Sequence, residues 1–317
     1  MYPLFFYPIF KDRIWGGTKL KTFLNKDIPT NITGESWELS TVPGDVSIVK
    51  NGIFKDKNLN ELIEQYPEEI LGKKIYQQFG KQFPLLFKFI DAREDLSIQL
   101  HPNDALAQKR HNSFGKTEMW YVLQADEEAR LVVGFKKQSS EEEFLKHLND
   151  KTLPAILNEI PVKKGDVFFL ETGTIHAIGG GIMLAEIQQT SDVTYRVYDW
   201  DRVDAQGNSR ELHLDLSLDA MNYNETPCKK DYATQPNTSN LMVVCPYFTT
   251  NFINLNDSYT IENKEDSFRV FQTLSGSCKI RVNDIEFEAK QGDTFLIPAQ
   301  ILHFELQGIA ELLEIFV

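Results

Sequence analysis

The segment GDVFFLETGTIHAI, residues 165–178, recurs as GDTFLIPAQILHFE at residues 292–305. Both copies contain a Gly-Asp pair, an aromatic residue two positions after the aspartate, and a histidine eleven positions after the glycine. Short apolar runs bounded by turn-forming residues are typical of strands joined by tight turns. The repeat therefore predicts a mainly β protein in which a jelly-roll β-barrel is present twice.

The length of 317 residues also favours two domains. The segment CKKDYATQPNTS at residues 228–239 is polar and lacks apolar periodicity, so we place the domain boundary there. The expected domains are residues 1–230 and 240–317. Helical spacing of apolar residues predicts short inserts in the first domain, namely two helices over residues 58–80 and a helical segment over residues 140–160.

Composition narrows the range of partners. With 33 basic and 46 acidic side chains the net charge is -13, which disfavours binding to nucleic acid or to an anionic membrane. An anionic ligand would need a local basic cluster. The cysteines Cys228, Cys245 and Cys278 are far apart and form no zinc or redox pair, which suits a reducing compartment. The apolar N-terminal MYPLFFYPIF is too short for a membrane span and has no basic residue before it, so we expect a cytoplasmic protein; the oligomeric state is left open.

We expect residues 85–100 to form a strand, which begins as an apolar run. Polar residues spaced by two stand at and just beyond its end. They are Ser97, Gln99 and His101, and on a strand they share one face. Polar groups at the end of an apolar strand are costly to bury unless something binds them. This stretch alone is compatible with a solvated strand face and with a metal site.

Two further residues complete a candidate metal site. Glu118 lies on an expected strand over residues 116–123, and His176 lies on the strand that follows the first Gly-Asp turn. Two imidazoles, a carboxylate and an amide oxygen suit a borderline divalent ion, zinc first, with a position left open for water or substrate. Gln99 is the weakest ligand of the four, because an amide could instead bind substrate or orient a ligand.

The second copy of the repeat lacks these partners. Arg269 stands where the first copy has Glu118, and no Gln-x-His pair precedes the second hairpin. We therefore expect His303 to be structural, residues 1–230 to form a catalytic zinc-binding domain, and residues 240–317 to form a degenerate copy.

Six ordered motifs resemble one family from end to end. They are RIWGG at 13–17, GESWELS at 34–40, PLLFKFIDAREDLSIQLHPND at 84–104, GKTEMW at 115–120, GTIHAIG at 173–179 and EIQQTSDVTYRVYDWDR at 186–202. The chain resembles the type I phosphomannose isomerases, a metal-dependent bicupin family. The resemblance implies that one zinc ion per chain is bound by Gln99, His101, Glu118 and His176, and that Arg196 is catalytic. The helical insert is shorter than in the larger members, and the length is similar to that of the compact bacterial forms.

The resemblance also implies reversible interconversion of mannose 6-phosphate and fructose 6-phosphate through an enediol. This proton transfer between C1 and C2 requires an oxyanion stabiliser, a base and a phosphate clamp. Glu186 and Lys116 are both candidates for the base, Glu186 being favoured, and Lys116 also for binding substrate. Arg196 remains charged at neutral pH, so it stabilises charge or positions substrate. Arg202 and Ser97 are candidate phosphate contacts, although Arg202 could equally form a surface salt bridge.

Two other functions fit a jelly roll with this ligand set. One is a non-enzymatic sugar-binding cupin with a structural metal or none, and the other is an Fe(II) oxygenase. The complete ligand set together with Arg196 favours the isomerase, which takes a small sugar phosphate as its substrate.

Overall fold

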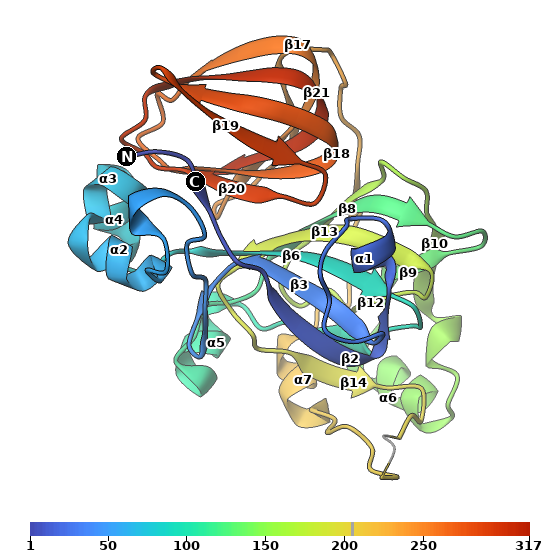
Figure 1. Cartoon of the computed structure of the whole chain (residues 1–317). Helices are drawn as coiled ribbons and strands as arrows, with labels where there is room; N and C mark the ends of the chain where they lie inside the picture. The colour runs from blue at the N-terminus through green and yellow to red at the C-terminus, as the bar shows by residue number, and fades with distance from the viewer. Residues whose placement is uncertain (204–205) are drawn as a thin grey trace.

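The computed structural model describes residues 1–203 and 206–317, and its elements form the two groups of sheets seen in Figure 1. The predicted mainly β fold is confirmed. The larger N-terminal sheet contains, in spatial order, β15 (Lys229–Lys230), β11 (Val167–Leu170), β8 (Glu118–Ala125), β13 (Ile182–Gln189), β6 (Leu85–Ala92), β2 (Ile9–Gly17) and β3 (Thr33–Leu39). A five-stranded sheet contains β10 (Leu157–Pro161), β9 (Arg130–Phe135), β12 (His176–Ile178), β7 (Ile98–Leu100) and β14 (Tyr195–Tyr198). β4 (Thr41–Val42) and β5 (Asp45–Val46) form a separate small hairpin.

The two N-terminal sheets pack face to face. Trp120 and Leu184 of the larger sheet share one buried apolar cluster with Leu131, Val133 and Ile178 of the five-stranded sheet. Such a double layer agrees with the expected jelly roll, and it brings the end of β7 and the start of β12 near the start of β8.

The C-terminal sheet, orange to red in Figure 1, lies against the N-terminal part of the molecule. Its order is β1 (Leu4–Phe5), β20 (Thr294–Ile297), β18 (Arg269–Val282), β21 (His303–Phe316), β17 (Thr249–Glu262) and β16 (Ser239–Val244), with β19 (Ile285–Lys290) paired to β18. The first strand of the chain therefore completes the sheet built by its last residues. A shared apolar core joins the two parts, since Phe87 and Tyr121 belong to the same buried cluster as Phe252, Val270 and Leu313.

The two turns of the predicted repeat have matching geometry. Gly165 and Gly292 have positive φ angles of 90° and 88°, which glycine adopts at little cost. The following aspartates accept hydrogen bonds from the backbone amides three residues earlier, at 3.1 Å for Asp166 and 3.0 Å for Asp293. His176 is buried at the start of β12, whereas His303 is exposed at the start of β21.

The helices differ from the prediction in number. Residues 58–80 form three short helices rather than two, α2 (Leu59–Gln65), α3 (Pro67–Leu71) and α4 (Lys73–Phe79). Pro67 begins α3 at a position where a missing N–H costs nothing. Gly72 ends it with a φ of 91°, and a Cβ there would lie 2.0 Å from the carbonyl oxygen of Asp266. The remaining helices are α1 (Lys19–Thr22), α5 (Asp104–His111), α6 (Glu141–Asn149), α7 (Leu214–Ala220) and the 3₁₀ turns Gly52–Phe54 and Leu153–Ala155.

Two of the predicted boundaries are wrong. The expected strand over residues 85–100 is divided into β6 and β7, which belong to different sheets. Asp95 fixes the crossing between them by accepting hydrogen bonds from the Gly180 amide at 2.7 Å and from Arg130 at 2.9 Å. The insert expected over residues 140–160 begins as a helix, with Ser140 as its N-cap, but its end forms β10. No helix in the described part of the chain has the length and apolar character of a membrane span.

Candidate active site

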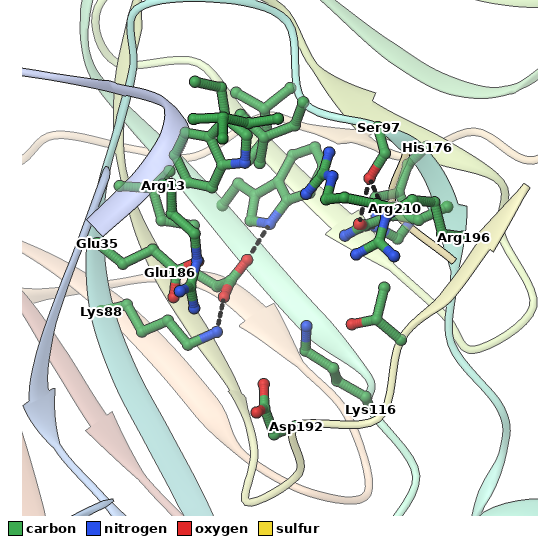
Figure 2. A pocket seen from close by; sticks show the side chains of 18 of the residues that line it. Arg13, Glu35, Lys88, Ser97, Lys116, His176, Glu186, Asp192, Arg196 and Arg210 are labelled. Atoms are coloured by element: carbon green, nitrogen blue, oxygen red, sulfur yellow. Dashed lines mark hydrogen bonds and ion pairs between the residues drawn. The ribbon is translucent and has the colours of Figure 1, made fainter. Parts of the chain in front are cut away.

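A cavity of about 500 Å³ opens between the two N-terminal sheets, and Figure 2 shows the side chains that line it. β7 and β12 place Gln99 and His176 opposite each other across one antiparallel pair. The wall on the larger sheet carries charged residues on strands that are otherwise apolar. The polar lining includes Arg13, Glu35, Lys88, Ser97, Gln99, Lys116, His176, Glu186, Asp192, Arg196 and Arg210.

Three predicted metal ligands lie close together, and one of them, His176, lines this cavity. The ligand atoms of His101, Glu118 and His176 all lie within 4.8 Å of one another, and the three residues are buried. The Nε2 atom of His176 is 3.3 Å from Oε1 of Glu118, and that of His101 is 3.7 Å from the same oxygen. The three side chains meet because each residue lies at one end of a strand. His176 starts β12, Glu118 starts β8 and His101 directly follows β7.

Both imidazoles are oriented by backbone carbonyls. Nδ1 of His101 lies 2.9 Å from the carbonyl oxygen of Val193, and Nδ1 of His176 lies 2.9 Å from that of Thr174. A carbonyl only accepts, so Nδ1 carries the proton and Nε2 keeps its lone pair toward the cluster. Burial lowers the pKa of His176 to about 4, and burial together with the charge of Lys116 lowers the pKa of His101. Both rings are therefore neutral at pH 7.

The Glu118 carboxylate is the strongest indication of a metal site. Its two oxygens are buried and accept no hydrogen bond from any residue in the described part of the chain. Its nearest cation is Lys116, whose Nζ lies 3.5 Å from Oε2, and burial raises the pKa of Glu118. A buried carboxylate without donors is costly, and a divalent ion on two neutral imidazoles would satisfy it. The donor set thus fits a metal ion.

Gln99 lies beside the cluster with its amide group against a ligand ring. Its Nε2 is 3.5 Å from Nε2 of His176, and its Oε1 accepts a hydrogen bond from Ser97 at 3.2 Å. Rotation of the amide by a half turn exchanges oxygen and nitrogen at nearly the same positions. The structure places Gln99 next to the cluster, and direct coordination by its oxygen stays a prediction.

Glu186 belongs to a buried charge pair on the cavity wall. Lys88 Nζ donates to Oε1 of Glu186 at 2.8 Å and to Oε1 of Gln188 at 2.7 Å, while Trp120 Nε1 donates to Oε2 of Glu186 at 3.0 Å. Figure 2 shows two of these bonds converging on Glu186. Burial raises the pKa of Glu186, but the charges of Lys88 and Lys116 outweigh it and lower the pKa overall. Glu186 is therefore ionised and able to accept a proton.

Sequence reasoning missed the charges that surround this pair. Glu35 Oε1 accepts from Arg13 at 2.8 Å and Oε2 from Trp37 at 2.6 Å. Burial alone would raise the pKa of Glu35, but the charges of Lys88 and Arg13 lower it to about 2. Lys88 itself lies within a strand that the structure shows to be buried throughout.

The predicted arginines occupy different positions. Arg196 lines the cavity and donates to Ser97 Oγ at 3.2 Å and to the carbonyl oxygen of Glu211 at 2.9 Å. Arg202 is not a lining residue, and its guanidinium donates to Asp199 and to a backbone carbonyl, so this geometry does not support its predicted contact with phosphate. Arg210, which sequence reasoning missed, lines the cavity and also bonds Asp199.

Comparison with known proteins identifies the family. The family model described as "Phosphomannose isomerase type I, catalytic domain" matches residues 4–138, and "Mannose-6-phosphate isomerase, cupin domain" matches residues 237–317. The chain is 36% identical to Mannose-6-phosphate isomerase ManA of Bacillus subtilis over 313 residues, covering 98% of this chain and 97% of that protein. It is also 36% identical over 315 residues to Mannose-6-phosphate isomerase of Streptococcus mutans, covering 98% and 97%. The crystal structure of the Mannose 6-Phosphate Isomerase from Bacillus subtilis superposes with a TM-score of 0.92 at 33% identity, covering 100% of both chains. The resemblance in the six motifs is thus confirmed over the full length, and the chain belongs to the type I phosphomannose isomerase family.

Proposed function

We propose that this protein interconverts mannose 6-phosphate and fructose 6-phosphate. The observation that carries the proposal is one cavity lined by His176 of the candidate metal cluster, by the ionised Glu186 and by Arg196. A sugar-binding module needs no such combination, whereas proton transfer through an enediol needs each part. The full-length relatives bear the name of this isomerase, which favours catalysis over simple sugar binding.

We propose that one zinc ion per chain is bound by His101, Glu118 and His176, with Gln99 as a fourth ligand. The neutral Nε2 atoms and the Glu118 oxygens without donors support this assignment. When bound, zinc would act as a Lewis acid toward the C1 and C2 oxygens of the open sugar.

Glu186 is the proposed base that moves the proton between C1 and C2. It is ionised and faces the cavity, and Lys88 and Trp120 fix its carboxylate, so it is held in one position with its lone pairs available. Lys116 is the second candidate and in either case a substrate contact, because its ammonium lines the cavity beside the cluster. Arg196 stabilises negative charge on the reacting oxygens or positions the substrate, since a guanidinium keeps its proton at neutral pH.

Ser97, Arg196 and Arg210 are proposed to receive the phosphate. The guanidinium groups of Arg196 and Arg210 provide the local positive charge that a dianionic substrate needs in a chain of net charge -13. Arg202 shares Asp199 with Arg210, so we assign Arg202 the role of holding that carboxylate in place.

Turnover and metal dependence test these assignments together. The purified protein is incubated with mannose 6-phosphate, and fructose 6-phosphate is measured before chelation, after chelation, and after return of zinc, manganese or cobalt. We expect activity to disappear with the metal and to return best with zinc. Absence of turnover by the metal-loaded protein would refute the isomerase, and full activity after complete chelation would favour a site in which the metal has no catalytic part.

Two further proposals concern the domain division and the cellular location of the protein. We propose that residues 1–230 and 240–317 are the two domains, β1 being a strand of the first that completes the sheet of the second. We further propose a cytoplasmic location, supported by the free thiols of Cys228, Cys245 and Cys278. Limited proteolysis between the domains and cell fractionation test these two statements.

A further inference from the structure

Tyr247 is a residue of the C-terminal sheet that reaches the N-terminal domain. It lies in the turn between β16 and β17 and packs against the apolar core shared by both parts. Its hydroxyl donates a hydrogen bond of 2.6 Å to Oδ2 of Asp104, a residue 143 positions earlier in the chain. Asp104 follows the ligand His101 by three residues. A polar contact thus connects the second domain to the segment that leaves the metal cluster.

Asp104 also binds a second segment of the site. Its other oxygen, Oδ1, accepts from the Gly115 amide at 2.8 Å and from Gln189 Nε2 at 2.9 Å. The Gln189 side chain in turn accepts from the Thr117 amide at 2.9 Å. The donors around Asp104 lower its pKa against the effect of burial, so it is an ionised acceptor.

The segment held in this way carries Lys116. Its neighbours Gly115 and Thr117 are the residues that Asp104 and Gln189 bind, and Glu118 follows directly as the first residue of β8. Lys116 Nζ lies 3.3 Å from Nε2 of His101 and 3.5 Å from Glu118. A Cβ on Gly115 would lie 2.7 Å from the backbone nitrogen of Asp104, so the two backbones approach as closely as glycine permits. Displacement of this segment would move the Lys116 ammonium relative to the cluster.

We propose that Tyr247 is a positioning residue for catalysis, through which the C-terminal domain holds Asp104 and thereby fixes Lys116 beside the metal cluster. This inference rests on the proposed function and gives the second domain, which lacks the ligand set of the first, a part in the reaction. Tyr247 does not line the cavity, so its effect reaches the substrate only through the residues it holds.

The test uses the zinc-loaded full chain with Tyr247→Phe, which removes one hydroxyl and keeps the ring in the shared core. We expect kcat to fall about tenfold, since a hydrogen bond to a charged acceptor is worth about that factor in an equilibrium. KM and bound zinc should change less than twofold. Hydrogen exchange of the Gly115 and Thr117 amides should become faster. The matched control is Tyr259→Phe, whose hydroxyl contacts Ser239 within the C-terminal sheet and which should leave kcat and exchange unchanged.

A double-mutant cycle separates positioning from general stability. In an Asp104→Ala background the Tyr247→Phe change should cost less than twofold in kcat, because the acceptor is already gone. An equal loss in both backgrounds, an unchanged kcat in the single variant, or unchanged amide exchange would overturn the proposal. If the wild-type protein turned over no mannose 6-phosphate, the proposed function would fail, while the exchange measurement would still decide whether Tyr247 holds this segment.

Discussion

Replacement of Lys88 by methionine tests the charge arrangement on which the role of Glu186 depends. Methionine keeps most of the length and volume of lysine but removes the charge. The Lys88 and Glu186 side chains are only 5% and 4% exposed, so solvent cannot take the place of the lost partner. Glu35 would still have Arg13, whereas Glu186 would retain, among the residues that the structure describes, a single hydrogen bond, from Trp120.

The size of the effect follows from this burial. Breaking a buried pair by removing one partner costs about 3–5 kcal/mol. A chain of 317 residues unfolds with an entropy of about 0.7 kcal/mol/K, so the melting temperature should fall by about 4–7 °C at pH 7.

The difference in stability between Lys88→Met and the wild-type protein should depend on pH, and the pKa of Glu186 gives the direction. In the wild-type protein the folded-state pKa of Glu186 is lowered, so its contribution to stability is present above the unfolded-state pKa and is lost as the pH falls through the folded-state value. Without Lys88, the charge of Lys116 is left to oppose the effect of burial, so we expect the folded-state pKa of Glu186 to rise above its wild-type value. The variant is then least stable relative to wild type at neutral pH, and the difference shrinks as the pH falls and Glu186 takes up a proton.

The pH profile of activity should also reflect the raised pKa of Glu186. A base must be ionised, so the acid limb of the kcat/KM profile shifts to higher pH in Lys88→Met. The assay is isomerase activity from pH 4 to 9 with bound zinc measured in parallel, and the matched control is Lys279→Met, which removes an exposed partner of Glu286. An acid limb that stays in place while Lys88→Met retains its zinc would refute Glu186 as the base.

Three further predictions concern the remaining groups of the site. Glu118→Gln removes the charged ligand and should reduce bound zinc to below about one tenth of the wild-type content and abolish turnover, which metal analysis of the dialysed protein checks. Arg196→Ala should retain its zinc but lose most of kcat, about 100-fold or more, with little recovery in Arg196→Lys; an equal loss of zinc would show that the role assigned to Arg196 is wrong. Arg210→Met should raise KM for the sugar phosphate about tenfold or more. Arg202→Met should raise KM less, and the reverse order would restore the direct phosphate contact predicted for Arg202.

The candidate metal ligands could be selected from the sequence because their spacing follows the period of a strand or the position of a turn. The period-two pattern placed Gln99 and His101 on one face, and the Gly-Asp repeat identified the turn before His176. The matching turns at Gly165 and Gly292 show why the repeat could be read, since each turn is a local structure built by neighbouring residues.

Charged residues on buried strands were not predictable in the same way. Lys88 has the spacing of a solvent-facing residue, and only the pairing of β6 with β13 and β3 shows that it stands opposite Glu186 and Trp37. Long-range register of this kind has no local signal. Arg210 could not be predicted either, because it lies in a polar stretch without periodicity. Tyr247 could not be predicted because its partner Asp104 belongs to another part of the chain.

The C-terminal sheet shows how a copy of the same unit can satisfy a buried carboxylate without a metal ion. β18 begins with Arg269 where β8 begins with Glu118, and Arg269 pairs with Glu314, which is fully buried. The other Glu314 oxygen accepts from Asn251 at 2.9 Å and from Ser239 at 2.6 Å. Glu118 has no such donors within the described residues, so its two oxygens remain available to the proposed metal ion. One sheet thus compensates its carboxylate with a side chain of its own, whereas the other leaves the carboxylate without a donor, as the proposed metal site requires.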